Sequence, residues 1–202
     1  MLELDKNKMI GKGYHRECYV HPKDESRCIK VITHGDLSET NREKAYYQLL
    51  AQKNISWQML PKYYGDVETN MGNGGVFDLI RDFDGSVSKT LVHYFSSNQE
   101  TERHYDAFKK AHLMLRDYLL DNCIVTMPIK PKNNLFQRMT DDSGQFLIID
   151  NIGNADFLPV CNYVDFLARA KIKRRWHRYE QNLRRDYPEN LMLHKLIEES
   201  YS

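Results

Sequence analysis

The sequence has almost no net charge and no long apolar run. Its 202 residues carry 29 lysines and arginines against 28 aspartates and glutamates, which leaves a formal net charge of +1 at pH 7. So small a surplus argues against a nucleic-acid or membrane-surface role for the chain as a whole, and no apolar stretch approaches the ~20 residues of a membrane span. Residues 1–9 lack the apolar segment of a secretory signal, so we expect a cytoplasmic protein without a membrane partner.

Cysteine is scarce and shows no metal-binding pattern. The four cysteines are Cys18, Cys28, Cys123 and Cys161. None of them forms a CxxC or similar spacing and all have apolar or aromatic neighbours, so we expect buried free thiols. A chain of this length can bury a sizeable core without a metal or a disulfide.

The first half of the chain predicts strands and one helix. Runs of β-branched and aromatic residues favour strands at 9–10, 18–20, 27–32, 63–68 and 76–80, the last two joined by the glycine-rich turn 70–75. Residues 38–52 have the pattern of a helix, with Ser38 or Thr40 as its N-cap.

The second half predicts helices around one hairpin. Apolar residues recur at steps of three and four between 105 and 119, which indicates an amphipathic helix. We expect a short strand at 123–126, a hairpin that pairs 135–136 with 146–149, and a helix after Asp165 that Pro188 interrupts. Strands with one helix, followed by helices around a hairpin, indicate an α+β fold in two lobes.

Lys30 lies in the middle of the apolar strand 28–32. A lysine there reaches the strand edge or meets a negative partner, since an unpaired buried charge is costly. Glu43 is a candidate partner because it shares a helix face with Tyr47 and Leu50. A strand lysine facing a helix glutamate is the ion pair that positions the lysine against nucleotide phosphates in kinases. Taken singly, each residue also fits an ordinary surface position.

Two glycines separated by one residue, Gly11 and Gly13, lie between the first two expected strands. They suit a loop whose backbone approaches phosphates closely, although a plain hairpin turn has the same pattern. The third glycine of a kinase loop is absent, and Arg16 stands in its place.

The segment IKPKNNL at 129–135 matches the D-L-K-P-x-N-x-L stretch of kinase catalytic loops from its second position on. A hairpin follows, and then LIIDNIG at 147–153, in which Asp150 ends an apolar strand. In this pattern Asn133 and Asp150 offer hard oxygen ligands to Mg²⁺, and Lys130 meets the transferred phosphate. An ordinary loop and an ordinary turn would explain either segment alone, but the order of the elements favours a kinase-like site.

The segments that carry a family resemblance are HRECYVHP (15–22), RCIKV (27–31), YYGDVET (63–69), FDLIRDFDG (77–85), DNCIVTMPIKPKNNL (121–135) and DNIG (150–153). Together they resemble the YrbL family of PhoP-regulatory-network proteins, compact bacterial members of the protein-kinase-like superfamily. The resemblance implies a compact two-lobed protein-kinase-like fold, with a β-rich N-lobe carrying one helix at 1–82, a truncated helical C-lobe at 83–202 and a hinge near 79–82. It also implies a role in envelope-stress or magnesium-responsive regulation.

One departure from the kinase pattern bears on the mechanism. Pro128 occupies the position of the catalytic aspartate, and proline can accept no proton. A recognisable activation segment and A-P-E anchor are also missing after Gly153. Candidate replacement bases are Asp117, Asp121 and His112. Nucleotide binding is therefore indicated more strongly than protein phosphorylation.

We expect an ATP- and Mg²⁺-binding phosphotransferase of unknown substrate. The alternative is a pseudokinase whose nucleotide-dependent shape is read by a regulatory protein partner. A third interpretation is a regulator that uses the basic segment 169–185 to bind nucleic acid or to dock an acidic partner. No nucleic-acid fold motif supports the former, and the favoured explanation of the segment is a solvated helix packed through Phe166, Ile172, Trp176 and Tyr179. The residues expected to act are Lys130, Lys30 and Glu43 in catalysis, Gly11, Gly13, Lys30 and Asp82 in nucleotide binding, and Asn133 and Asp150 in metal binding.

Overall fold

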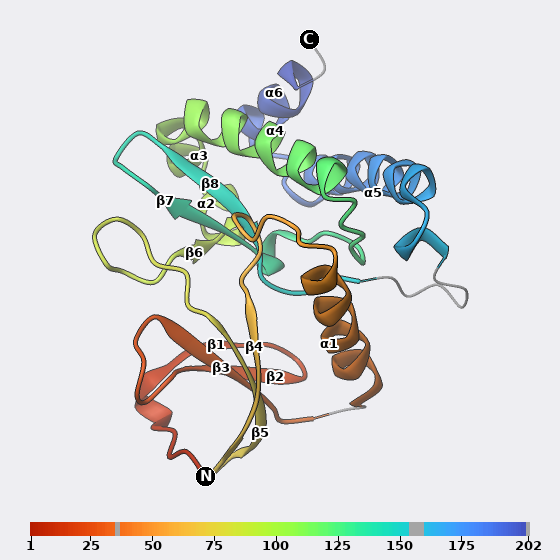
Figure 1. Ribbon diagram of the computed structural model, residues 1–202. Helices are drawn as coiled ribbons and strands as arrows, with labels where there is room; N and C mark the ends of the chain where they lie inside the picture. Colours follow the sequence, from red (N-terminus) through yellow and green to blue (C-terminus); the bar gives the residue numbers. More distant parts are fainter. Residues whose placement is uncertain (35–36, 154–159, 201–202) are drawn as a thin grey trace.

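The structure is a computed structural model that describes residues 1–34, 37–153 and 160–200. Figure 1 shows a β-sheet with one helix in the part of the molecule near the N-terminus, and helices around a small sheet in the other part. The expected α+β fold is confirmed. The expected division of the chain at residues 82 and 83 stays a prediction.

The first part is an antiparallel five-stranded sheet with the strand order β1-β2-β3-β5-β4. Its strands are β1 (Met9–Lys12), β2 (Arg16–Val20), β3 (Arg27–Ile32), β4 (Tyr63–Thr69) and β5 (Gly72–Asp78). Successive residues of β3 alternate between the two faces, so Ile29 and Val31 enter one apolar cluster while Cys28 enters another.

Helix α1 (Leu37–Gln52) packs on the Cys28 face of this sheet. The ring of Tyr47 lies edge-on to Phe77, with 5.4 Å between the ring centroids. The predicted helix is confirmed, but it begins before Ser38. Ser38 and Thr40 therefore lie inside the first turn and do not precede it as N-caps.

The second part contains five α-helices and a three-stranded sheet in the order β6-β7-β8 among the described residues. The helices are α2 (Leu91–Phe95), α3 (Asn98–Arg103), α4 (Tyr105–Asp121), α5 (Asp165–Asp186) and α6 (Leu191–Glu199), and the strands are β6 (Lys89–Thr90), β7 (Asn134–Arg138) and β8 (Gly144–Ile148). Single 3₁₀ turns occur at Lys6–Lys8, Pro131–Asn133 and Val160–Asn162. The long helices and the 135–149 hairpin agree with the sequence-based predictions, whereas β6, α2 and α3 were not foreseen.

The predicted strand at 123–126 is wrong. Cys123 has a positive φ of 50°, so the chain turns after the end of α4 and does not enter a strand. Within 123–126 only Thr126 makes a β-bridge, and its partner is Ile152. The apolar run is explained by burial, because Ile124 and Val125 are both 0% exposed. Burial without strand pairing produces the same sequence pattern.

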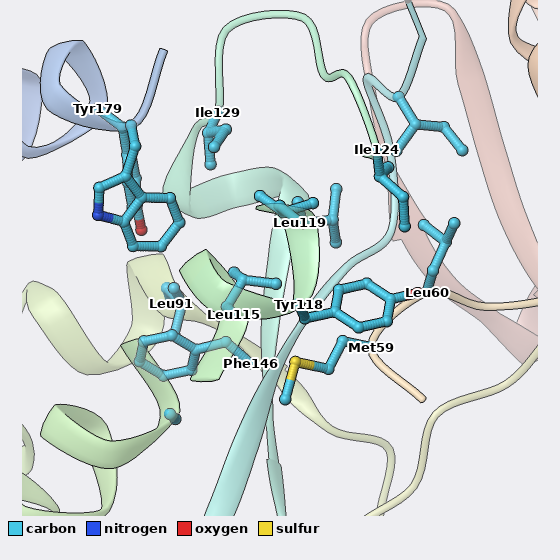
Figure 2. Packing of buried hydrophobic residues seen from close by; sticks show 14 of the residues in the cluster. Met59, Leu60, Leu91, Leu115, Tyr118, Leu119, Ile124, Ile129, Phe146 and Tyr179 are labelled. Atoms are coloured by element: carbon cyan, nitrogen blue, oxygen red, sulfur yellow. The ribbon is translucent and has the colours of Figure 1, made fainter. Parts of the chain in front are cut away.

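The core of the helical part is continuous with the base of the loop 127–133. Figure 2 shows Ile129 among buried residues from α4, including Leu115 and Leu119, and near Tyr179 of α5. Ile129 is buried while its neighbours Pro128 and Lys130 are exposed. The core therefore holds this loop through Ile129 and leaves the residues on either side of Ile129 accessible.

Helix α5 is held by its apolar face, as expected for Ile172, Trp176 and Tyr179, which are at most 3% exposed. Phe166, in the first turn of the helix, is 71% exposed, so its predicted packing is wrong. All four cysteines are free, as predicted, although Cys18 and Cys161 are only half-buried. No helix in the described part of the chain combines the length and apolar character needed to cross a bilayer.

Candidate functional site

A cavity of about 1090 Å³ lies between the five-stranded sheet and the loop 127–133. Its walls come from β1 to β3, from the connection between the two parts at Leu79 and Ile80, and from the segment that follows β8. Six of the residues that the sequence assigns to a site line it: Gly11, Gly13, Lys30, Lys130, Asn133 and Asp150. The chain therefore brings together positions that are as much as 139 residues apart (150 minus 11).

The glycine loop forms one edge of this cavity. The backbone N–H of Gly13 donates to the carbonyl oxygen of Arg16 at 2.7 Å, which closes a tight turn between β1 and β2. A Cβ atom at Gly13 would lie 3.3 Å from that same oxygen. The turn thus favours glycine at this position, and it directs the start of β2 toward the cavity.

Lys30 reaches from β3 across to the segment that follows β8. Its ammonium group donates a hydrogen bond to the carbonyl oxygen of Ile149 and lies 4.6 Å from the centroid of the Phe77 ring. Gly75 pairs with Lys30 in the neighbouring strand, and a Cβ atom there would come within 2.9 Å of the Phe77 ring. The missing side chain at Gly75 leaves room for the ring that supports the lysine.

Glu43 pairs with Arg16, and among the described residues it makes no hydrogen bond or ion pair with Lys30. Its carboxyl group is buried, and burial raises the pKa of Glu43 against the lowering effect of the Arg16 charge. One carboxyl oxygen, Oε1, has no partner within the described part of the chain. The predicted role of Glu43 in orienting Lys30 stays a prediction.

Asp150 follows β8 at a turn that holds its carboxylate toward the cavity. The turn is built by Asn151 and Gly153, with φ of 63° and 106°, in the left-handed region that these two residue types tolerate best. The backbone N–H of Asn151 donates to Oδ1 of Asp150 at 2.7 Å, and Arg16 donates to the same oxygen. Burial would raise the pKa of Asp150, but the charges of Lys30 and Arg16 outweigh it and hold the pKa below its usual value.

The loop 127–133 supplies the remaining side chains. The backbone N–H of Ile149 donates to the carbonyl oxygen of Asn133 at 2.9 Å, which fixes Asn133 beside the strand that leads to Asp150. The buried side chain of Asn134 donates to the carbonyl oxygen of Lys130 at 2.8 Å. These bonds hold the backbone of the loop, while Lys130 and the ring of Pro128 line the cavity.

The donor set fits a magnesium ion. Asp150 offers a carboxylate and Asn133 an amide oxygen, and no hydrogen bond from another described residue engages the Asn133 side chain. No group of three or more His, Cys, Asp or Glu within the described residues could hold a metal without further ligands. Mg²⁺ is commonly bound by one or two protein oxygens together with water and phosphate oxygens, which is the arrangement that these two residues allow.

Asp82 lies outside the cavity lining. Its buried carboxylate accepts hydrogen bonds from the hydroxyl of Ser88 and from the backbone and side chain of Arg138. These bonds fasten the connection between the two parts to β7. In this structure Asp82 acts as a structural anchor, and its predicted place in nucleotide binding is not supported by its position.

The three candidate replacement bases also lie outside the lining. His112 is buried between α4 and α5, where its Nε2 is 2.9 Å from Oε1 of Glu180. Asp117 pairs with Arg116 at 3.0 Å, and Asp121 is exposed at the end of α4. None of these side chains faces Pro128 across the cavity.

Among the cavity residues to which the sequence assigned no role, Arg16 and His93 are of most interest. In the sequence Arg16 stands out only as a departure from the glycine pattern. A charged residue at a position where a kinase loop needs no side chain is the feature that could have indicated its role. His93 of α2 lines the cavity as well, but α2 was itself not predicted, so nothing in the sequence placed this histidine. The segment after Gly153, where an activation segment is expected to be missing, includes residues 154–159, which lie outside the described residues.

The fold is that of a protein kinase. A crystal structure of a kinase domain superposes on the chain with a TM-score of 0.51 at 16% sequence identity, over 75% of this chain and 52% of that one. This chain therefore spans about half the length of that kinase domain. At this identity the likeness concerns the fold alone.

Within this class, the family can be stated more closely. Protein YrbL of Escherichia coli (strain K12) is 37% identical over 182 residues, which cover 89% of this chain and 86% of that protein, and YrbL of Shigella flexneri matches to the same extent. The family model described as PhoP regulatory network protein YrbL matches residues 2–184. The chain belongs to the YrbL family of PhoP regulatory network proteins.

Proposed function

We propose that the chain binds ATP with Mg²⁺ in the cavity beside Lys30 and acts as a phosphotransferase of unknown substrate in the cytoplasm. The observation that carries this proposal is the convergence of Lys30, Lys130, Asn133 and Asp150 on one cavity. They come from three separate places in the chain, namely β3, the loop 127–133 and the segment after β8, and chance burial gives no reason for all of them to line the same space.

The charge of the cavity wall supports a phosphate ligand. Besides two lysines from the kinase motifs, the wall carries further cationic side chains, and together these outnumber the carboxylates in the lining, which are Glu17, Glu39, Asp78 and Asp150. An anion that enters the cavity can therefore replace lost water contacts with ion pairs. The cationic residues in the lining are Lys12, Arg16, Lys30, Lys89, Lys130 and Lys132.

The side chains divide the work as follows. Lys30, already directed at the segment before Asp150, is placed to hold phosphate oxygens near the metal ligands, and Lys130 is placed to neutralise charge on the transferred group. Asp150 and Asn133 would hold Mg²⁺, which supplies charge stabilisation between the phosphates when bound. Gly11 and Gly13 leave the backbone of the loop open to close approach.

Nucleotide binding is tested by thermal unfolding with and without Mg-ATP. A ligand that binds only the folded chain adds about 2.7 kcal/mol at 100 times its Kd, which at this size raises Tm by roughly 5–10 °C. We expect Lys30→Met and Asp150→Asn to lose most of the rise. The matched controls are Lys110→Met and Asp117→Asn, exposed residues of α4 outside the cavity, which should keep it. No rise with any nucleotide and divalent cation would contradict the proposal.

A second candidate function is supported by Pro128. This proline lines the cavity at the position of the kinase catalytic aspartate and offers no base. With ATP bound but no phosphoryl transfer, the chain would be a pseudokinase, a binding module whose nucleotide-dependent shape is read by a regulatory protein partner. A bound nucleotide together with turnover no higher than that of Asp150→Asn would favour this function over the first.

A further inference from the structure

Arg16 lies where three elements of the chain meet. It begins β2, and its guanidinium group is bound by the carboxylates of Glu43 on α1 and of Asp150 after β8. The Arg16 side chain is 17% exposed, that of Glu43 is 7% exposed and that of Asp150 is 31% exposed. The ion pair with Glu43 is therefore largely shielded from water and stronger than it would be at the surface, whereas Asp150 stays open to the cavity.

Arg16 bridges the two carboxylates. One nitrogen of its guanidinium group, Nη1, donates to Oε2 of Glu43, and the other, Nη2, donates to Oδ1 of Asp150. Arg16 supplies the positive charge at the place where a divalent cation on Asp150 would supply it instead.

The hydrogen bonds at Asp150 leave little room for both cations. Oδ1 accepts from Arg16 and from the backbone N–H of Asn151, so its two lone pairs are already used. A metal ion that binds Oδ1 needs the position held by Arg16. A metal ion on the other oxygen would lie beside a guanidinium group of like charge, and the repulsion between the two cations would weaken its binding.

Glu43 offers Arg16 an alternative partner. Arg16 donates to Oε2 of Glu43, while Oε1 of the same carboxylate is buried and has no partner among the described residues. A guanidinium group released from Asp150 can bind both oxygens of Glu43, which is the favoured two-bond geometry of an arginine with a carboxylate. The release therefore gives up the ion pair with Asp150, adds a second hydrogen bond to Glu43, and still leaves Arg16 with a charged partner.

We propose that Arg16 competes with the divalent cation for Asp150, holding the metal site closed until the cation displaces it onto Glu43. This inference rests on the proposed function in one respect, because it takes Asp150 as the metal ligand. It does not depend on catalysis or on the identity of the nucleotide.

The test measures the binding of Mn²⁺ alone to the full chain, by the loss of the electron paramagnetic resonance signal of free Mn²⁺. We expect Arg16→Gln to bind Mn²⁺ about tenfold more tightly than the unaltered chain, within the usual range of coupling between two groups that compete. Adding Asp150→Asn to this variant should abolish the gain. Arg16→Lys keeps a charge that can reach only one of the two carboxylates. Its affinity for Mn²⁺ should therefore fall between that of the unaltered chain and that of Arg16→Gln.

The matched control is Lys12→Gln, which removes a cation from the same cavity wall. Lys12 pairs with Glu17 at 2.9 Å and forms no ion pair with Asp150, so its loss should change Mn²⁺ affinity much less. An effect of Arg16→Gln no larger than that of Lys12→Gln would overturn the inference, since general cavity charge would then explain it. If Arg16→Gln does not fold, Arg16→Lys decides, and an affinity equal to that of the unaltered chain overturns the inference.

Failure of this inference and failure of the proposed function give different results. If the unaltered chain shows the Mg-ATP shift and Arg16→Gln leaves Mn²⁺ affinity unchanged, only the inference fails. If Arg16→Gln gains Mn²⁺ affinity through Asp150 and no nucleotide shifts Tm, the inference stands and ATP binding is rejected.

Discussion

The hydroxyl oxygen of Tyr46 accepts a hydrogen bond from the backbone N–H of Val125, 79 residues away in the chain, at 2.7 Å. Tyr46 lies on α1, three residues after Glu43 and so about one helical turn from it. Val125 leads into the loop that carries Pro128 and Lys130. Burial raises the pKa of Tyr46, so its hydroxyl stays protonated. This bond fastens the helix of the first part to the loop of the second.

Removing this bond should destabilise the protein. Tyr46→Phe keeps the ring but leaves the buried N–H of Val125 without a partner, which costs about 1–3 kcal/mol. The control is Tyr64→Phe, whose hydroxyl bonds to Asp78 at an exposed site and whose loss should cost under ~0.5 kcal/mol. Urea unfolding measures both. Equal effects would mean that the Tyr46 bond contributes no more than a surface contact.

Asp82 should matter for stability and not for nucleotide binding. Asp82→Asn removes the buried one of the two carboxylates that Arg138 binds, and Asp84 remains as the other. It should cost about 1–3 kcal/mol, because the charge-assisted hydrogen bond at the buried Asp82 site is lost. The Mg-ATP dependence of Tm should remain, since Asp82 does not line the cavity. A folded variant that has lost the nucleotide-dependent rise would return Asp82 to the binding site.

Helix α5 should be held by Trp176 and not by its basic residues. The Trp176 side chain is 3% exposed, donates from Nε1 to Glu180 at 2.9 Å, and lies 4.6 Å from the His112 ring. Trp176→Ala should cost about 3–5 kcal/mol, as large core truncations do.

The companion variant reverses two exposed charges on the same helix. Arg174→Glu with Arg178→Glu should change stability by no more than about 0.5 kcal/mol per site, since no ion pair involving either residue is present among the described residues. A tolerant Trp176 together with a strongly destabilised charge reversal would mean that electrostatics, and not the core, hold this helix.

The sequence predicted which residues line the cavity better than it predicted the ion pairs among them. Lys30, Asn133 and Asp150 were found because each lies at a fixed distance from a strong local pattern: an apolar strand, a proline turn, a strand end. The ion pair of Glu43 with Arg16 was not predicted, because it depends on how α1 and β2 pack in three dimensions. Local patterns locate a side chain along the chain, but they do not say which of two nearby cations a carboxylate meets.

Short elements without strong periodicity were also beyond the sequence. Helix α2 has five residues and β6 has two, too few for a period of 3.6 or 2 to be recognised. The apolar run 123–126 had the opposite problem, since burial gave it the composition of a strand without the pairing. In both cases tertiary contacts and not local preference decided the backbone.

Pro128 stands where a kinase has its catalytic aspartate, so replacing it tests whether the chain is an enzyme or a pseudokinase. Its ring faces the cavity beside Lys130, so Pro128→Asp would place a carboxylate where an acceptor hydroxyl is expected to lie. If transfer is limited only by the missing base, the rate should rise by up to ~10²–10⁴-fold. If another group already accepts the proton, the rate should stay level or fall. We expect low but measurable turnover in the unaltered chain, because phosphoryl transfer depends mainly on positioning and charge stabilisation.

The measurement is release of inorganic phosphate from Mg-ATP together with incorporation of labelled phosphate into the protein. Pro128→Asn is the matched control. It removes the ring as Pro128→Asp does, and its side chain has the size of aspartate but cannot act as a base. Loss of the proline also loosens the unfolded chain by about 0.4–1 kcal/mol, so the folding of both variants must be checked first. Asp150→Asn serves as the blank, because it keeps the shape of the side chain and removes the metal-binding charge.

A gain in Pro128→Asp alone assigns the carboxylate a catalytic role in this fold. Turnover of the unaltered chain equal to that blank, with nucleotide bound, makes the chain a pseudokinase.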